Sequence, residues 1–98
     1  MPSNDELTLA RVLTRRVLTI AIDASGIGFN SYAGGIYDGM YAGSPDCSTD
    51  INLADHTTVL VGFTPEYFIM RNSWGPAWGI SGYMFIARKY KYVFFFKL

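Results

Sequence analysis

The chain has 98 residues, enough for one small domain that buries a modest fraction of its surface. Eight Lys and Arg residues balance eight Asp and Glu residues, so no net charge points to nucleic acid or a membrane surface as a partner. The single cysteine, Cys47, excludes an internal disulfide and any metal site built on several cysteines.

The N-terminal sequence does not have the pattern of a targeting signal. MPSNDELTLARVLTRR is charged and lacks the apolar core of a secretory signal peptide. No stretch of the chain approaches the length needed to span a membrane. Half of the residues are apolar and 16% are aromatic, which suggests surface that is covered by something else.

A helix is expected first, from Asn4 or Asp5 to about Arg15. Ser3 is its expected N-cap, and Glu6 stands three residues further on, as the capping-box pattern requires. Apolar residues recur at helical spacing along this segment: Leu9, Val12, Leu13 and Val17. These positions give the helix one apolar stripe.

Strands and turns are expected after the helix. Residues 18–23 are rich in β-branched side chains and predict a buried strand, residues 29–32 a single helical turn, and residues 34–37 a short extended piece. Residues 38–52 are turn-forming residue types throughout and predict a loop. Three further strands are expected, at His56–Phe63, residues 67–72 and residues 82–88.

Two apolar runs predict a pair of adjacent strands. Residues 59–63 and residues 67–70 are joined by a short turn that contains Pro65. His56 precedes the first run and Asn72 follows the second, so antiparallel pairing brings the two polar side chains to the same end. The sequence therefore predicts a polar pair at one edge of the sheet, where it could face a cleft.

Several short motifs follow one another in a fixed order: Phe29, Tyr32, Gly35-Ile36-Tyr37, Asp55-His56, Asn72-Ser73-Trp74-Gly75, Trp78-Gly79 and Gly82-Tyr83. In this order they resemble the papain-like cysteine peptidases of the cathepsin type, from about Asp5 to Arg88. The resemblance implies an α+β fold, with one N-terminal helix followed by an antiparallel β-sheet or half-barrel, as in the right-hand domain of that family. Residues 1–98 would form a single partial domain, the C-terminal half of such a peptidase.

The last ten residues depart from the family. Residues 89–98 read KYKYVFFFKL, a divergent hydrophobic tail where the family continues into a segment with glycine and cysteine. Within it, residues 93–96 are a strand candidate or an aggregation-prone stretch.

The resemblance assigns roles to four residues. His56 resembles the family's catalytic histidine, and Asn72 resembles the asparagine whose amide oxygen orients the imidazole. Trp74 resembles the aromatic residue that shields their hydrogen bond from water, and Trp78 resembles the second wall on the leaving-group side. An isolated histidine at a strand end is more often an ordinary structural residue, but the ordered set of four favours catalysis.

Two further positions match residues that line the family's pocket for the substrate's second side chain. They are Ala21 and Thr57, and plain strand packing explains both equally well. Thr57 departs from the small residue that is usual after the histidine. This departure predicts a narrower or more polar pocket.

Cys47 is not expected to be the nucleophile. The family's nucleophile lies in a Cys-Trp motif at the head of a long helix, and this sequence contains no Cys-Trp pair. The glutamine that stabilises the oxyanion belongs to the same missing half. The resemblance therefore implies that the chain alone does not cleave peptides.

Two functions stay open at this point. The first is the C-terminal portion of a papain-like cysteine-type peptidase, with a peptide or protein substrate and a helical half or separate subunit that carries the nucleophilic cysteine. The second is a non-catalytic, truncated homologue that binds peptides or inhibitors, or an inactive fragment. The family implies neither a metal nor an organic cofactor, and it implies a lysosomal or extracellular location.

Overall fold

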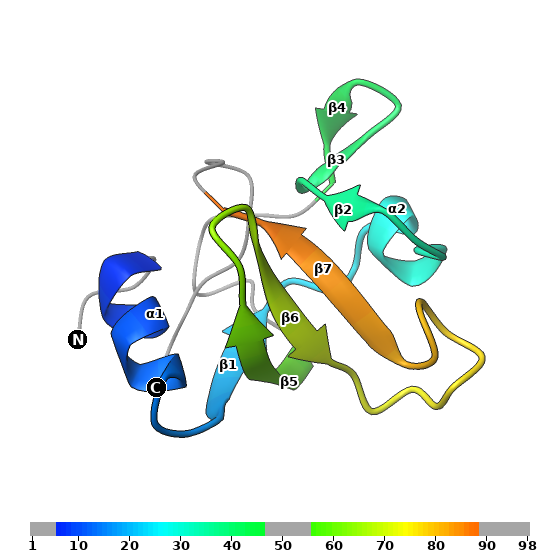
Figure 1. Cartoon of the computed structure of the whole chain (residues 1–98). Helices are drawn as coiled ribbons and strands as arrows, with labels where there is room; N and C mark the ends of the chain where they lie inside the picture. Colours follow the sequence, from blue (N-terminus) through cyan, green and yellow to red (C-terminus); the bar gives the residue numbers. More distant parts are fainter. Residues whose placement is uncertain (1–5, 47–55, 89–98) are drawn as a thin grey trace.

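The computed structural model describes residues 6–46 and 56–88. The helices and strands in these ranges are α1 Glu6–Leu13, β1 Leu18–Ile22, α2 Ile27–Asn30, β2 Ile36–Tyr37, β3 Met40–Tyr41, β4 Ser44–Pro45, β5 His56–Phe63, β6 Tyr67–Arg71 and β7 Tyr83–Ala87 (Figure 1). The expected α+β arrangement, a helix followed by a sheet, is confirmed.

Five strands form one sheet in the order β1-β5-β6-β7-β2 (Figure 1). The pairs β1–β5, β5–β6 and β6–β7 are antiparallel, whereas β2 runs parallel to β7. The sequence predicted an antiparallel sheet, and this edge pair makes the sheet mixed. The parallel pair arises because the segment through α2 carries the chain from β1, at one edge, to the opposite edge, where Ile36 and Tyr37 lie opposite Phe85 and Ile86.

The core lies on one face of this sheet because apolar side chains alternate along its strands. In β1, Leu18, Ile20 and Ile22 are buried and Thr19 is exposed. The other buried apolar side chains of this core come from α1, from α2 and the segment after it, and from the remaining strands and loops: Leu9, Ala24, Phe29, Tyr32, Tyr37, Leu60, Phe68, Met70, Trp78, Met84 and Ile86. The core therefore joins the sheet to the aromatic side chains near α2.

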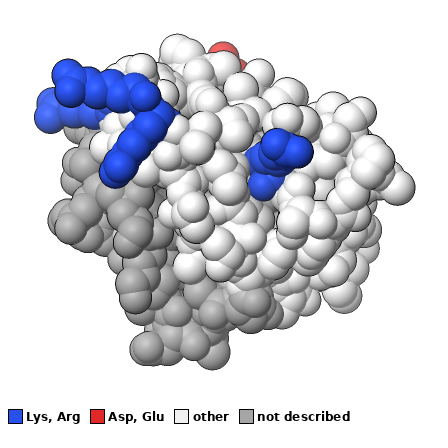
Figure 2. All heavy atoms as spheres, turned by 90° about the horizontal axis from the view of Figure 1, so that it is seen from below, with Lys and Arg blue, Asp and Glu red and all other residues white. Residues whose placement is uncertain are grey.

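The helix α1 ends before its predicted end at Arg15. The Thr14 hydroxyl donates to the Arg11 carbonyl oxygen at 2.6 Å, and the N–H groups of Arg15 and Arg16 donate to the Val12 carbonyl oxygen at 3.0 and 3.1 Å. These bonds form a tight turn at the end of the helix. Arg11, Arg15 and Arg16 line a hollow there, and Figure 2 shows basic side chains gathered at one edge of this face of the molecule.

A short hairpin occupies part of the segment that was predicted as a loop. Its strands, β3 and β4, are antiparallel and are joined through Ala42 and Gly43, whose φ angles are 52° and 82°. Two successive positive φ angles are typical of the tight turns that join hairpin strands. The side chain of Asp38 supports the entry to β3 by accepting the Met40 N–H at 3.0 Å.

Three predictions fall on residues outside the described ranges. They are the helix cap at Ser3, the part of the predicted loop at residues 47–52 and the strand candidate at residues 93–96. Within the described ranges, no helix has the length and apolar character that crossing a lipid bilayer requires.

Candidate active site

His56 and Asn72 meet where β5 begins and β6 ends, at the ends of two inner strands of the sheet. His56 is the first residue of β5, Asn72 follows the last residue of β6, and the two strands are antiparallel, with Val59 opposite Arg71. The imidazole Nε2 of His56 lies 2.8 Å from the amide Oδ1 of Asn72, although 16 residues separate the two. This contact is the polar pair that the strand pattern places at the sheet edge.

A second hydrogen bond shows which atom of the Asn72 amide faces His56, and therefore which ring nitrogen carries the proton. The backbone N–H of Ser73 donates to Asn72 Oδ1 at 2.7 Å, and a donor of this kind requires an oxygen as its partner. Because an amide oxygen can only accept, the proton in the contact with His56 belongs to Nε2. In the neutral ring Nδ1 is then left without a proton and can accept one.

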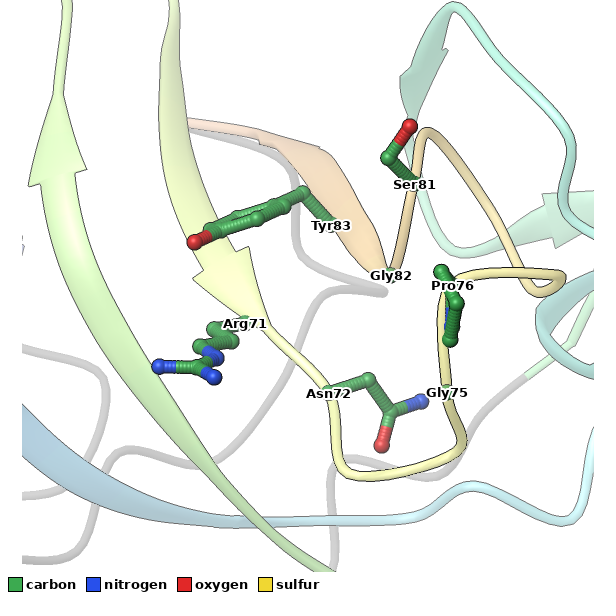
Figure 3. A pocket seen from close by; sticks show the side chains of 7 residues that line it. All are labelled: Arg71, Asn72, Gly75, Pro76, Ser81, Gly82 and Tyr83. Atoms are coloured by element: carbon green, nitrogen blue, oxygen red, sulfur yellow. The ribbon is translucent and has the colours of Figure 1, made fainter.

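Asn72 is anchored on the other side by the loop that follows it. Its backbone N–H donates to the Gly82 carbonyl oxygen at 3.0 Å, and the side chain is only 6% exposed. Within the described residues, its buried Nδ2 has no hydrogen-bond partner. In Figure 3 this nitrogen points toward Gly75, at a pocket of about 210 Å³.

Arg71 and Asn72 are neighbours that lie on different sides of the chain. Figure 3 shows the Arg71 side chain pointing away from the amide of Asn72, as successive residues at a strand end do. Arg71 is exposed, whereas Asn72 is buried. The guanidinium therefore does not join the His56–Asn72 pair.

Trp74 covers the imidazole of His56. The two ring centroids lie 5.0 Å apart, with the planes tilted by 32°. The Trp74 ring also makes edge-to-face contacts with two other aromatic rings. Its centroid lies 5.4 Å from that of Phe29, with an angle of 89° between the planes, and 5.5 Å from that of Trp78, with an angle of 83°. The indole is 39% exposed, so one part of it contacts the core and His56 while another part reaches solvent.

Trp78 lies deeper than Trp74. It is 9% exposed, its indole N–H donates to the Phe29 carbonyl oxygen at 3.1 Å, and its ring contacts those of Phe29 and Tyr32. Among the described ring contacts, Trp78 touches Trp74 and not His56. Its predicted role as a second wall stays a prediction, and the contact that links it to the pair runs through Trp74.

Ala21 and Thr57 lie opposite each other in the β1–β5 pair, next to the pair Ile22 and His56. Ala21 is half-buried and Thr57 is exposed. Because successive residues of a strand point to opposite faces, Thr57 faces away from the side that His56 occupies. A pocket at Ala21 and Thr57 would therefore lie on the other face of the sheet edge.

The support beneath Trp74 was missed from the sequence. Phe29 was noted only as part of a motif, and Asp46 only as part of a turn-forming segment. In the structure, the Asp46 carboxylate accepts the backbone N–H groups of Gly28 and Phe29 at 3.0 and 2.8 Å and the hydroxyl of Tyr37. The pair of glycines flanking Ile27 is the only local signal of this contact.

The part of the chain that the structure describes contains no group of three His, Cys, Asp or Glu side chains arranged to hold a metal ion.

Comparison with known proteins identifies the family. The family model described as "Papain family cysteine protease" matches residues 1–94. The chain belongs to the papain family of cysteine proteases. This finding confirms the resemblance that the NSWG, WG and GY motifs predicted.

Two relatives within this papain family come from plants. The chain is 40% identical over 92 residues to cysteine protease XCP2 of Arabidopsis thaliana and 38% identical over 88 residues to mexicain of Jacaratia mexicana. Each alignment covers 90% of this chain, but only 23% of XCP2 and 37% of mexicain. The chain thus spans well under half the length of these relatives.

Solved structures of papain-family enzymes share the fold. The Carica candamarcensis cysteine protease CMS1MS2, solved in complex with E-64, superposes with a TM-score of 0.79 at 33% identity. Bromelain from Ananas comosus, solved with the E64 inhibitor, gives a TM-score of 0.73 at 28% identity. Both superpositions cover 92% of this chain, and they cover 38% and 40% of those proteins.

Proposed function

We propose that this chain supplies the histidine and the asparagine of a papain-like cysteine-type peptidase that cleaves peptide or protein substrates. His56 is the general base and acid, and Asn72 orients its ring. The nucleophilic cysteine and the oxyanion glutamine belong to a helical half, joined to this chain or present as a separate subunit. The single observation that carries the proposal is the 2.8 Å contact between His56 Nε2 and Asn72 Oδ1 beneath Trp74.

The proton positions in this contact suit the chemistry. Because Nε2–H is engaged by Asn72, Nδ1 is the ring atom that takes the proton of the partner's thiol, leaving a thiolate and an imidazolium. The thiolate attacks the peptide carbonyl carbon, and Nδ1–H then donates its proton to the departing amine. Attack of water on the acyl-enzyme, with the same nitrogen as base, releases the acid and restores the thiol.

Asn72 and Trp74 act on the imidazole rather than on the substrate. Asn72 Oδ1 accepts from Nε2–H in both the neutral and the protonated ring, so the ring keeps one orientation throughout the cycle. An amide does this without placing a second negative charge beside the thiolate–imidazolium pair. Trp74 lies over the ring and limits the access of water to the hydrogen bond.

Ala21 and Thr57 are proposed to line the pocket for one substrate side chain. They lie side by side at the same sheet edge as His56, but on the face opposite to its ring. The hydroxyl of exposed Thr57 would make this pocket more polar than a small apolar residue would. Trp78 is proposed to bound the leaving-group side only through its contact with Trp74.

The alternative function is a non-catalytic homologue that binds peptides or inhibitors. The observation that favours it is the sequence itself, since the only cysteine, Cys47, has no tryptophan after it. The two functions make different demands on His56. A binding module needs only an exposed surface, whereas the peptidase needs the imidazole.

A fusion of the N-terminal part of mexicain to this chain tests the peptidase. We expect the fusion to hydrolyse a peptide substrate, and we expect a thiol-alkylating reagent to block it by labelling a cysteine of the added N-terminal part and not Cys47. His56→Ala should lower kcat/KM by about 10³-fold or more, since general acid–base catalysis contributes roughly 10²–10⁴-fold. Asn72→Ala should lower it by roughly 10- to 100-fold, the equivalent of one hydrogen bond to a charged group.

The contradicting result is equally definite. If the fusion folds and hydrolyses peptide at the same rate with His56→Ala, this chain does not supply the base. If it folds, melts cooperatively and shows no hydrolysis, the non-catalytic alternative is favoured. The family resemblance also leads us to propose a location: the intact enzyme would work in a lysosome-like compartment or outside the cell.

A further inference from the structure

The carboxylate of Asp46 lies between α2 and β2 and binds both. Its two oxygens accept the backbone N–H groups of Gly28, at 3.0 Å, and Phe29, at 2.8 Å, and one of them also accepts the hydroxyl of Tyr37. Its own backbone N–H donates to the Gly39 carbonyl oxygen at 2.7 Å. The Asp46 side chain thus joins the start of α2 to the end of the β3–β4 hairpin, although Asp46 is 18 residues from Gly28 and 17 residues from Phe29 in the sequence.

The two glycines beside this carboxylate are explained by the space it occupies. A Cβ at Gly26 would lie 2.2 Å from the Asp46 carbonyl oxygen and 2.4 Å from its Cγ, and a Cβ at Gly28 would lie 2.9 Å from its Oδ2. Gly26 has an ordinary extended backbone, with φ −69° and ψ 147°, so backbone strain is not the reason for a glycine there. Only glycine lets the Asp46 carboxylate reach the backbone of α2.

Phe29 carries this contact to the site. Its backbone N–H is held by Asp46, its carbonyl oxygen accepts the indole N–H of Trp78 at 3.1 Å, and its fully buried ring meets the ring of Trp74 at 5.4 Å. Trp74 in turn lies 5.0 Å from the ring of His56. Phe29 and Trp78 are therefore what keeps a partly exposed indole in place over the imidazole.

We propose that Asp46 is a positioning residue for the His56–Asn72 pair, acting through Phe29 to hold Trp74 over the imidazole. The proposal rests on the proposed function, because a cover over the imidazole matters only if the imidazole is catalytic. The hydrogen bonds of the Asp46 side chain go to Gly28, Phe29 and Tyr37, so it acts on the His56–Asn72 pair only through Phe29 and then Trp74. Its loss is expected to loosen the indole pair before it unfolds the sheet.

Nuclear magnetic resonance of the full chain tests this with Asp46→Ala and Asp46→Asn. The first readout is hydrogen exchange at the Trp78 indole N–H, which reports its bond to Phe29. The second is the ring-current shift that Trp74 imposes on the ring protons of His56. Asp38→Asn is the matched control, since Asp38 also accepts a backbone N–H, that of Met40, which lies in β3 and not in α2.

With Asp46→Ala, we expect exchange at the Trp78 indole to rise about tenfold or more, because local opening exposes that N–H. We also expect the His56 shift to move toward the value found with Trp74→Ala. Asp46→Asn should give a smaller change in the same direction, because an amide oxygen still accepts one of the backbone N–H groups. Asp38→Asn should change neither readout.

The proposal is overturned if Asp46→Ala lowers the melting temperature while both readouts stay at their wild-type values, since Asp46 would then be merely structural. If Asp46→Ala does not fold, Tyr37→Phe replaces it, because it removes one donor to the carboxylate and keeps a ring against Phe29. Unchanged readouts in Tyr37→Phe also overturn the proposal. Neither readout needs a nucleophile. An inactive mexicain fusion would therefore contradict the proposed function without changing what the two readouts say about the contact from Asp46 to Trp74.

Discussion

The imidazole Nε2 of His56 and the amide Oδ1 of Asn72 are 2.8 Å apart, and the Ser73 N–H shares the same oxygen at 2.7 Å. Together these two bonds determine the tautomer of the ring, because the shared oxygen can only accept. The sheet edge supplies the geometry, because β5 begins where β6 ends. The loop that returns to β7 supplies the cover, Trp74.

That loop depends on glycine at one position more than at another. Gly75 and Gly79 both have positive φ, 92° and 62°, but a Cβ meets nothing within 4 Å at Gly75 and lies 2.5 Å from the Tyr83 carbonyl oxygen at Gly79. Gly75→Ala should lower the free energy of unfolding by about 1–2 kcal/mol, the backbone cost alone. Gly79→Ala should lower it by roughly 2–5 kcal/mol, because overpacking adds to that cost.

Urea denaturation of the two alanine variants measures the difference. Equal losses of stability at the two positions would contradict the close approach of Gly79 to the Tyr83 carbonyl oxygen.

The two faces of β5 are tested by neighbouring substitutions. Leu60 is 0% exposed and Val61 is 37% exposed, and the register with β6 shifts between Leu60 and Gly62. Leu60→Ala should lower the free energy of unfolding by about 2–5 kcal/mol, because it leaves a cavity in the core. Val61→Ala should change it by less than about 1 kcal/mol. A larger loss of stability in Val61→Ala than in Leu60→Ala would mean that Val61, and not Leu60, faces the core.

Tyr32 makes the free energy of unfolding depend on pH in the alkaline range. Burial raises the pKa of its hydroxyl above the ordinary value of 10.0, although the N–H that Phe85 donates to it acts in the opposite direction. The folded chain then holds this proton more tightly than the unfolded chain. The stability that follows is fully present below pH 10.0 and is lost as the pH rises through the folded pKa.

Comparison with Tyr32→Phe isolates this residue from the other tyrosines. The variant loses the hydrogen bonds of the hydroxyl and should be less stable at neutral pH. The difference in free energy of unfolding between the two proteins should shrink above pH 10.0, since only the wild type loses this contribution. A difference that stays constant or grows with pH would contradict the raised pKa.

Parts of this fold could be predicted because burial repeats along them. Apolar runs and β-branched residues predicted β1, β5, β6 and β7 to within one residue at each end, and the pairing of β5 with β6 followed from the short turn at Pro65. The family followed from motifs that include Asn72, Trp74 and Trp78. These features are local, so a pattern of neighbouring residues indicates them.

Other parts depend on contacts that no local pattern carries. The strands β3 and β4 have two residues each, too few to show a period, and their turn uses Ala42, a residue type that does not signal positive φ. The parallel pairing of β2 with β7 and the bond from Asp46 to Phe29 join distant segments. Such contacts are set by the packed structure and not by a pattern of neighbouring residues.

The most direct test of the account is the protonation of the two ring nitrogens of His56 in the full chain. Nitrogen chemical shifts of the neutral ring, measured in ¹⁵N-labelled protein, distinguish a protonated from a bare nitrogen. We predict the proton on Nε2 and none on Nδ1, and we predict that Asn72→Ala weakens this preference, because the acceptor of the Nε2 proton is lost. A proton on Nδ1 with Nε2 bare would contradict the pairing on which the proposed function rests.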